Sequence, residues 1–125
     1  MKKNRISVLF LLALGILWTT ALNAQEPQKI SLVQTPGEFV QQELKLEAGK
    51  SYVFEVENSG VDRQVGFVIA PKGKTNKENH VQSAYLFKTI GDGEKAASKT
   101  VTLEKGEYVY FCPLNPTPQY KIVVE

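Results

Sequence analysis

The fold of this chain is decided by residues 101–115, which have the sequence VTLEKGEYVYFCPLN. Apolar side chains alternate with polar ones through much of this stretch, the pattern of half-buried β-strands. The stretch contains Cys112, the only cysteine of the chain, and Pro113 follows it directly. The apolar segment Tyr120 to Val124 closes the sequence. We therefore expect a late strand that ends in a lone thiol, then a proline-rich loop and one final strand.

The same period-two alternation continues toward the N-terminus, whereas helical periodicity is hard to find. Turn signals rich in Gly, Pro and Asn separate the apolar stretches at the spacing of a sandwich or barrel. The run Val81 to Ile90 is ambiguous, Lys72 to Asn79 is expected to be a loop, and Glu94 to Lys99 is expected to be a loop or one helical turn. The fold class predicted is all-β, with seven or eight short strands, of which the clearest are Ile30–Gln34, Leu44–Leu46, Tyr52–Val56, Val65–Ile69, Thr100–Leu103, Tyr108–Cys112 and Tyr120–Val124.

The first residues have the pattern of a secretory signal peptide. Lys2, Lys3 and Arg5 give a basic start, and a continuous apolar run of 13 residues, 6–18, follows. The small residue Ala24 precedes the expected cut. A membrane anchor is the alternative, but a span needs about 20 apolar residues. We predict a signal peptide over residues 1–24 and one folded domain over residues 25–125, located in the periplasm or secreted, with no membrane span after cleavage.

Composition excludes several classes of function. Residues 25–125 hold 12 basic and 13 acidic side chains, a net charge of −1. A nucleic-acid partner is not expected, because it requires a clustered positive face. A single cysteine cannot form an internal disulfide, and Met1 is the only methionine, so residues 25–125 contain no thioether.

Three segments of the chain resemble the cupredoxin family, the plastocyanin- and azurin-like β-sandwiches. They are the hairpin 44–54 (LKLEAGKSYVF), the stretch 58–67 (NSGVDRQVGF) and the strand 103–112 (LEKGEYVYFC), the last being the most specific. The resemblance covers most of residues 25–125. It implies a single Greek-key β-sandwich or barrel, with a copper ion held at one end by two histidines, a cysteine and usually a methionine.

When the four ligands of the family are assigned to this chain by position, only the cysteine is present, so the ligand set is degenerate. The first histidine falls on Arg63, with Gln64 beside it, the cysteine falls on Cys112, the second histidine on Asn115 and the methionine most directly on Tyr120. A guanidinium stays protonated and has no lone pair for a metal. An amide oxygen is a poor match for copper beside a thiolate. The resemblance thus implies the scaffold without a complete blue-copper site, and no cofactor is expected.

Two hypotheses remain for the chemistry of Cys112. If the Arg63 guanidinium lies beside the sulfur, it favours the thiolate and makes Cys112 reactive. If it does not, Cys112 is a small buried apolar residue, the usual situation of a free cysteine. A metal could still bind through Cys112 together with His80, the only histidine of the chain, if the polar loop around His80 folds back.

The function predicted from these residues is a non-enzymatic binding module. No Ser, His and Asp set suggests a catalytic triad, and Gly91-Asp92-Gly93 lacks the residues of a phosphate loop. In the family, the apolar surface around the ligand loop docks partners, and Pro113, Pro116 and Pro118 would pre-shape it here. We expect an envelope or periplasmic protein as the partner. The alternative is a copper-binding electron-transfer or copper-carrier protein that uses Cys112 with non-standard ligands.

Overall fold

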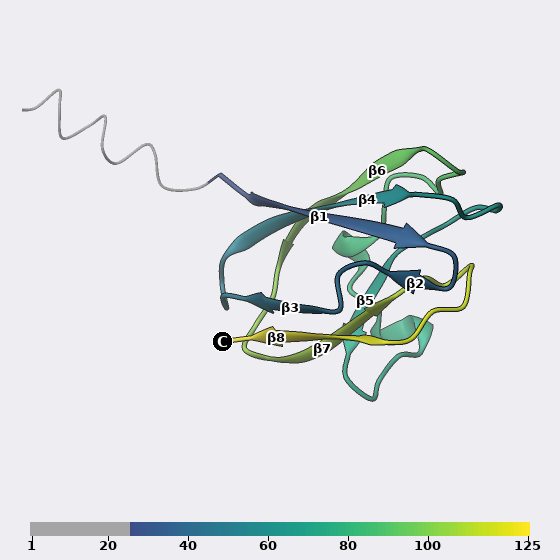
Figure 1. Ribbon diagram of the computed structural model, residues 1–125. Helices are drawn as coiled ribbons and strands as arrows, with labels where there is room; N and C mark the ends of the chain where they lie inside the picture. The colour runs from purple at the N-terminus through teal and green to yellow at the C-terminus, as the bar shows by residue number, and fades with distance from the viewer. Residues whose placement is uncertain (1–25) are drawn as a thin grey trace, which may run out of the picture.

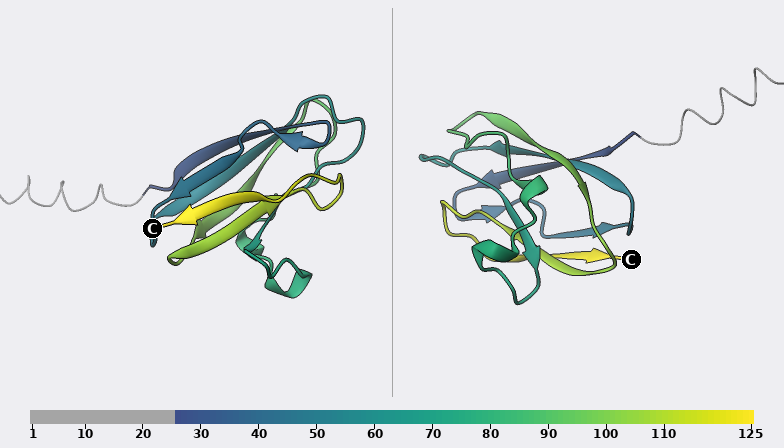
Figure 2. Two further views of the ribbon diagram at one scale, coloured as in Figure 1. Left: turned by 60° about the horizontal axis from the view of Figure 1, so that its bottom comes forward. Right: turned by 180° about the vertical axis from the view of Figure 1, so that it is seen from behind.

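A computed structural model describes residues 26–125 (Figure 1). The signal peptide predicted for residues 1–24 lies outside the described residues. Eight strands form two four-stranded sheets packed as two layers, as Figure 2 shows from two further sides. The all-β sandwich predicted from the sequence is therefore confirmed. In the part of the chain that the structure describes, no helix is long and apolar enough to cross a membrane.

The two sheets each contain four strands. The first sheet has the order β2 (Glu38–Phe39), β1 (Gln28–Thr35), β4 (Ser51–Asn58), β6 (Lys95–Thr102). The second has the order β3 (Glu43–Leu46), β8 (Tyr120–Val124), β7 (Gly106–Phe111), β5 (Val68–Pro71). Strands β1 and β4 pair in parallel, as do β3 and β8, and the remaining neighbours are antiparallel. The chain crosses from one sheet to the other at every connection from β2 to β7, which links the two layers.

The core lies between the sheets and is built by the alternation seen in the sequence. In β4, Tyr52, Phe54 and Val56 are buried, and the residues between them are more exposed. An aromatic cluster joins the two layers: Phe39 meets Tyr110 and Tyr120 edge-to-face, with ring centroids 5.3 Å and 5.7 Å away. Such geometry adds to the stabilisation by area burial. Burial raises the pKa of the Tyr110 phenol well above its ordinary value, and the nearby Tyr120 adds to this shift.

Two expectations about elements are wrong. Residues 94–99 are not a loop or helical turn, because β6 begins at Lys95 and pairs with β4. Ala96 and Ala97 have small side chains, so the sequence shows no alternation of apolar and polar residues there. The pairing of β6 with β4 is made by the backbone and does not depend on that alternation. The expected strand at Val65 starts later, at Val68, and Val65 forms an isolated bridge with Ile90 instead. The ambiguous stretch 81–90 contains η2 (Gln82–Ala84), and η1 (Lys77–Asn79) precedes it.

Candidate functional site

Three loops meet around Cys112 at one end of the sandwich. They are the loop from β4 to β5, the loop from β7 to β8, and the segment that leads into β6. The isolated bridge between Val65 and Ile90 joins the first to the third. A hydrogen bond from Gly66 to Cys112 joins the first to the second. The site is thus assembled from segments that lie far apart in the sequence.

Main-chain groups hold the sulfur of Cys112. Its Sγ accepts hydrogen bonds from the N–H of Gly66 at 3.5 Å and the N–H of Asn115 at 3.3 Å. The N–H of Cys112 donates to the hydroxyl of Thr117 at 3.2 Å, which donates in turn to the carbonyl of Pro118 at 3.0 Å. Only 4% of Cys112 is exposed. The thiol is therefore fixed in place and largely shielded from solvent.

Gly66 lets the loop after β7 approach the backbone closely. A Cβ atom at this position would lie 3.3 Å from Cγ of Pro113 and 3.4 Å from its Cδ, with Leu114 Cδ1 at 3.7 Å. Because the first two distances are tighter than ordinary contact, a larger residue at position 66 would push the Pro113 loop away. Glycine is needed here for space.

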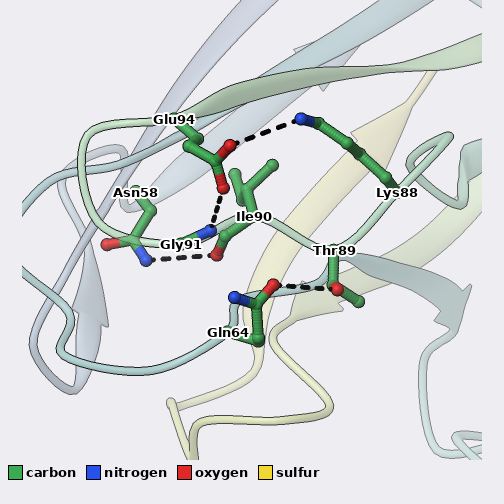
Figure 3. Close-up of polar contacts among 7 residues, drawn as sticks. All are labelled: Asn58, Gln64, Lys88, Thr89, Ile90, Gly91 and Glu94. Atoms are coloured by element: carbon green, nitrogen blue, oxygen red, sulfur yellow. Dashed lines mark hydrogen bonds and ion pairs between the residues drawn. The ribbon is translucent and has the colours of Figure 1, made fainter.

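The loop that carries Arg63 is fixed by a buried amide at the end of β4. The side chain of Asn58, fully buried, donates to the carbonyls of Val61 and Arg63, both at 3.1 Å, and of Ile90 at 3.3 Å. Its Oδ1 accepts the N–H of Val61 at 2.9 Å. Figure 3 shows Asn58 reaching across to Ile90. This amide positions the loop that presents Gly66 to the sulfur.

One further contact ties the same loop to the segment before β6, and another lies within that segment. The hydroxyl of Thr89 donates to Oε1 of Gln64 at 3.0 Å, and the N–H of Gly91 donates to Oε1 of Glu94 (Figure 3). The bond from Gly91, and then the ammonium of Lys88 at 3.4 Å, hold the pKa of Glu94 below its ordinary value. These contacts brace the rim of the site.

Of the residues predicted to lie around Cys112, Asn115 is the one that hydrogen-bonds to its sulfur. Asn115 lies against Cys112 through its main chain, and its Nδ2 is buried without a hydrogen-bond partner in the described residues. Arg63 is exposed, and its main-chain carbonyl accepts a hydrogen bond from the side chain of Asn58. The side chain of Gln64 accepts a hydrogen bond from the hydroxyl of Thr89. Tyr120 is buried, and its hydroxyl accepts the N–H of Phe39 at 3.0 Å.

The two ring nitrogens of His80 contact groups other than the sulfur of Cys112. Its Nδ1 lies 2.8 Å from the hydroxyl of Tyr85, and its Nε2 lies 2.9 Å from the carbonyl of Thr75. The ring packs edge-on against Phe111, with the centroids 6.0 Å apart. Both ring nitrogens are therefore occupied by contacts that hold the loop between β5 and β6.

The residues present do not fit a blue-copper ion. Such a site needs imidazole lone pairs around the thiolate, whereas the positions aligned with the two histidines hold Arg63 and Asn115. Over residues 26–125, no three His, Cys, Asp or Glu side chains gather closely enough to hold a metal ion. The degenerate ligand set expected from the sequence agrees with this geometry.

An apolar cleft opens beside the Cys112 loop. This loop cleft, with a volume of about 360 Å³, is lined by Gly66, Phe67, Tyr85, Leu86, Lys88, Thr89, Pro113 and Leu114. The side chain of Leu114 stands at its edge and is 47% exposed. Sequence reasoning anticipated the part made by Pro113 but missed Gly66 and Leu86. Gly66 interrupts an apolar run, which could have signalled a close backbone approach.

Comparisons with known proteins agree with the fold. A sequence profile for the family described as "Cupredoxin-like domain" matches residues 7–124. Auracyanin A, a blue copper protein from Chloroflexus aurantiacus, superposes with a TM-score of 0.65 at 19% identity, over 80% of this chain and 100% of that chain. An azurin from Methylomonas sp. strain J gives a TM-score of 0.57 at 16% identity, over 80% and 99%.

A copper-containing nitrite reductase from Thermus scotoductus contains a similar fold. Its TM-score is 0.52 at 22% identity, over 82% of this chain and 23% of that chain. At these identities the likenesses establish the fold alone. No curated protein sequence matches the chain.

Proposed function

The chain belongs to the cupredoxin-like family, and from this premise we propose that it is an exported, non-enzymatic binding protein that does not use copper. Its partner is an envelope or periplasmic protein that docks on the loop cleft. The observation that carries the proposal is the enclosed sulfur of Cys112, held by two main-chain N–H groups beside an open apolar cleft. The loop that would supply a copper ligand in a blue-copper protein therefore shapes one wall of the loop cleft here.

The loop cleft has the character of a docking surface. Pro113 fixes the backbone of one wall, and Cys112 anchors that wall through its hydrogen bonds to Gly66 and Asn115. Leu114 presents an exposed apolar side chain at the edge. A pre-shaped apolar surface loses little conformational entropy when a partner binds. A rigid wall and an exposed leucine therefore favour protein docking.

The copper-carrier alternative requires a rearrangement. For His80 to become a ligand beside Cys112, one of its ring nitrogens must release its partner, the Tyr85 hydroxyl on Nδ1 or the Thr75 carbonyl on Nε2. The loop between β5 and β6 would lose that contact at the same time. Binding of copper would therefore be accompanied by a structural change that the metal has to drive.

A copper titration tests the absence of a metal function. The purified protein is titrated with Cu(II), and absorbance is followed for a thiolate-to-copper band, while competition with a chelator reports Cu(I) affinity. We expect the protein to behave as its Cys112→Ser variant does, without a band and without tight binding. Tight 1:1 binding that is lost in both Cys112→Ser and His80→Gln would establish the copper carrier instead.

Site-directed photo-crosslinking tests the docking surface. A photoreactive amino acid is placed at position 114 or at position 40 in the producing cells. Val40 is a matched control, because it is an apolar side chain, 56% exposed, that does not line the loop cleft. We expect a discrete crosslinked product from position 114 only. Equal products from both positions would contradict docking at the loop cleft.

A further inference from the structure

The outer edge of β6 is only half covered. One side of this strand pairs with β4. On the other side, Leu86 forms a bridge with Ser98, and the N–H of Phe87 donates to the carbonyl of Ala97 at 3.0 Å. The Ser98 hydroxyl donates to the carbonyl of Lys99. Among residues 26–125, no strand pairs with this edge at residues 100–102, so its main chain is unpaired there, although η2 packs against β6.

A second cleft lies where the covering segment meets the strand. This edge cleft, of about 440 Å³, is lined by Gln82, Ser83, Tyr85, Leu86, Phe87 and Lys99. Phe87 is 71% exposed, the largest fraction among the exposed large apolar side chains of the described residues. Phe87 pairs with β6 at Ala97, and the unpaired main chain begins further along the strand, at residue 100. Together they offer an apolar anchor and hydrogen-bonding groups to an incoming segment.

Lysines are the only charged residues on β6 and on the segment that covers its edge, although Glu94 and Glu104 flank β6. Residues 80–90 and 95–103 carry Lys88, Lys95 and Lys99 and no acidic side chain, although residues 26–125 as a whole have more acidic than basic residues. Lys88 is paired with Glu94, and Lys95 with Glu57. Lys99, which lines the edge cleft, has no ion pair in the described part of the chain. The edge is therefore complementary to a negative charge.

We propose that β6 binds an extended acidic segment of another protein by strand addition along residues 100–102. An acidic side chain of that segment meets Lys99, and an apolar side chain packs on Phe87 in the edge cleft. Strand addition takes its affinity from main-chain hydrogen bonds and its specificity from pockets for alternate side chains. The edge cleft shares Tyr85 and Leu86 with the loop cleft but includes none of the residues of its Cys112 wall, so the inference goes beyond the proposed function.

Charge also selects between possible occupants of this edge. In an edge-to-edge dimer of two copies, the lysines of both β6 edges would be brought together, and lysines on an edge strand disfavour such pairing. The edge strand β3 is a poorer site for an acidic segment, since Glu43 accompanies Lys45 on it. An acidic segment bound at β6 gives Lys99 an ion-pair partner. It avoids both the lysine–lysine repulsion of a dimer and the repulsion from Glu43 at β3.

Peptide binding tests the inference. The probe is the synthetic peptide acetyl-Thr-Glu-Val-Leu-Val-Glu-Thr-amide, titrated into the isotope-labelled protein and followed by NMR. We expect shifts in the amides of residues 99–102 and in Tyr85 to Phe87. A peptide with lysine in place of both glutamates should bind about fivefold more weakly, a ratio suited to an exposed charge pair. Amide exchange at residues 100–102 should slow when the acidic peptide binds.

Charge reversal supplies the matched control. Lys99→Glu should reverse the preference between the two peptides, whereas Lys45→Glu on β3 should leave it unchanged. Shifts confined to β3 or to the Pro113 loop, or a preference that ignores the sign at position 99, would overturn the inference. Absence of shifts at millimolar peptide would do the same. A Leu114→Ser variant separates the two surfaces, because it should impair docking at the loop cleft and leave peptide binding intact.

Discussion

The main-chain N–H of Gly66 donates a hydrogen bond to the sulfur of Cys112, 3.5 Å away and 46 positions along the chain. This contact couples the loop after β4 to the loop after β7. Gly66 has no side chain, and Pro113 packs against it. A Cβ atom at position 66 would lie 3.3 Å from Cγ of Pro113. The enclosure of the thiol and the shape of the loop cleft therefore depend on the same glycine.

Replacing Gly66 with alanine should open the Cys112 loop. The added methyl group would press on Pro113, and overpacking of this kind costs about 1–3 kcal/mol. We expect the free energy of unfolding, measured in urea, to fall by about 1 kcal/mol. The native thiol should also react faster with a neutral disulfide reagent, because the displaced loop no longer shields the sulfur. In the parent protein the reaction should be slow until denaturant is added.

A double-mutant cycle identifies the cause of the Gly66→Ala effect. If the methyl group acts on the proline ring, Pro113→Ala should make the substitution at position 66 less costly. The two changes should then be non-additive in the free energy of unfolding. Additive losses would show that the strain lies elsewhere.

Much of the fold could be predicted from the sequence, because strand alternation is a local property. The buried residues Tyr52, Phe54 and Val56 of β4 follow directly from it. The strand β6 was less visible, since Ala96, Ala97 and Ser98 have small side chains and their pairing with β4 is made by the backbone. Period-two patterns therefore identify strands whose faces differ in polarity and miss those whose faces do not.

The site was harder to predict because its geometry is set by tertiary hydrogen bonds. Positional comparison placed Arg63 at the site, whereas the residue of the same loop that donates to the sulfur is Gly66. The path between them is determined by Asn58, which binds the carbonyls of Val61, Arg63 and Ile90. A buried amide that gathers three carbonyls leaves no periodic signal in the sequence.

Asn58→Asp should strongly destabilise the protein. The carboxylate keeps the acceptor for the N–H of Val61, but it replaces the donor amide with an oxygen that faces three carbonyl oxygens. Leaving buried polar groups unpaired beside a buried charge should cost about 3 kcal/mol of the free energy of unfolding. Asn76→Asp is the control, since Asn76 is exposed and makes no side-chain capping bond at η1. An equal effect at both positions would contradict the role given to Asn58.

Gln34→Met should stabilise the protein. Gln34 is fully buried on β1, and neither atom of its side-chain amide has a hydrogen-bond partner in the described residues. An apolar side chain of similar shape removes the desolvation cost of these atoms, so we expect a gain of about 1 kcal/mol in urea unfolding. The control Leu32→Met, on the same buried face, should lower stability by less than about 1.5 kcal/mol. A loss at position 34 would show that an ordered water satisfies the amide.

Glu94→Gln should change how stability depends on pH. The hydrogen bond from Gly91, and then Lys88, lower the pKa of Glu94 in the folded protein from its ordinary value of 4.5. The unfolded chain therefore takes up this proton more readily than the folded protein. The stabilisation is fully present above pH 4.5 and is lost as the pH falls through the folded pKa. The stability difference between the parent and Glu94→Gln should accordingly be largest near about pH 7 and shrink in acid.

The two causes of the Glu94 shift can be separated by a titration of its carboxylate, followed by NMR. Lys88→Gln should raise the pKa of Glu94 only part of the way, because the N–H of Gly91 still donates to Oε1. Added salt should weaken the part due to Lys88 and leave the part due to Gly91, since an exposed ion pair is screened and a hydrogen bond in direct contact is much less so. If Lys88→Gln restored the ordinary pKa completely, the ion pair and not the turn at Gly91 would dominate. The brace that joins residues 88–94 at the rim of the site would then depend on ionic strength.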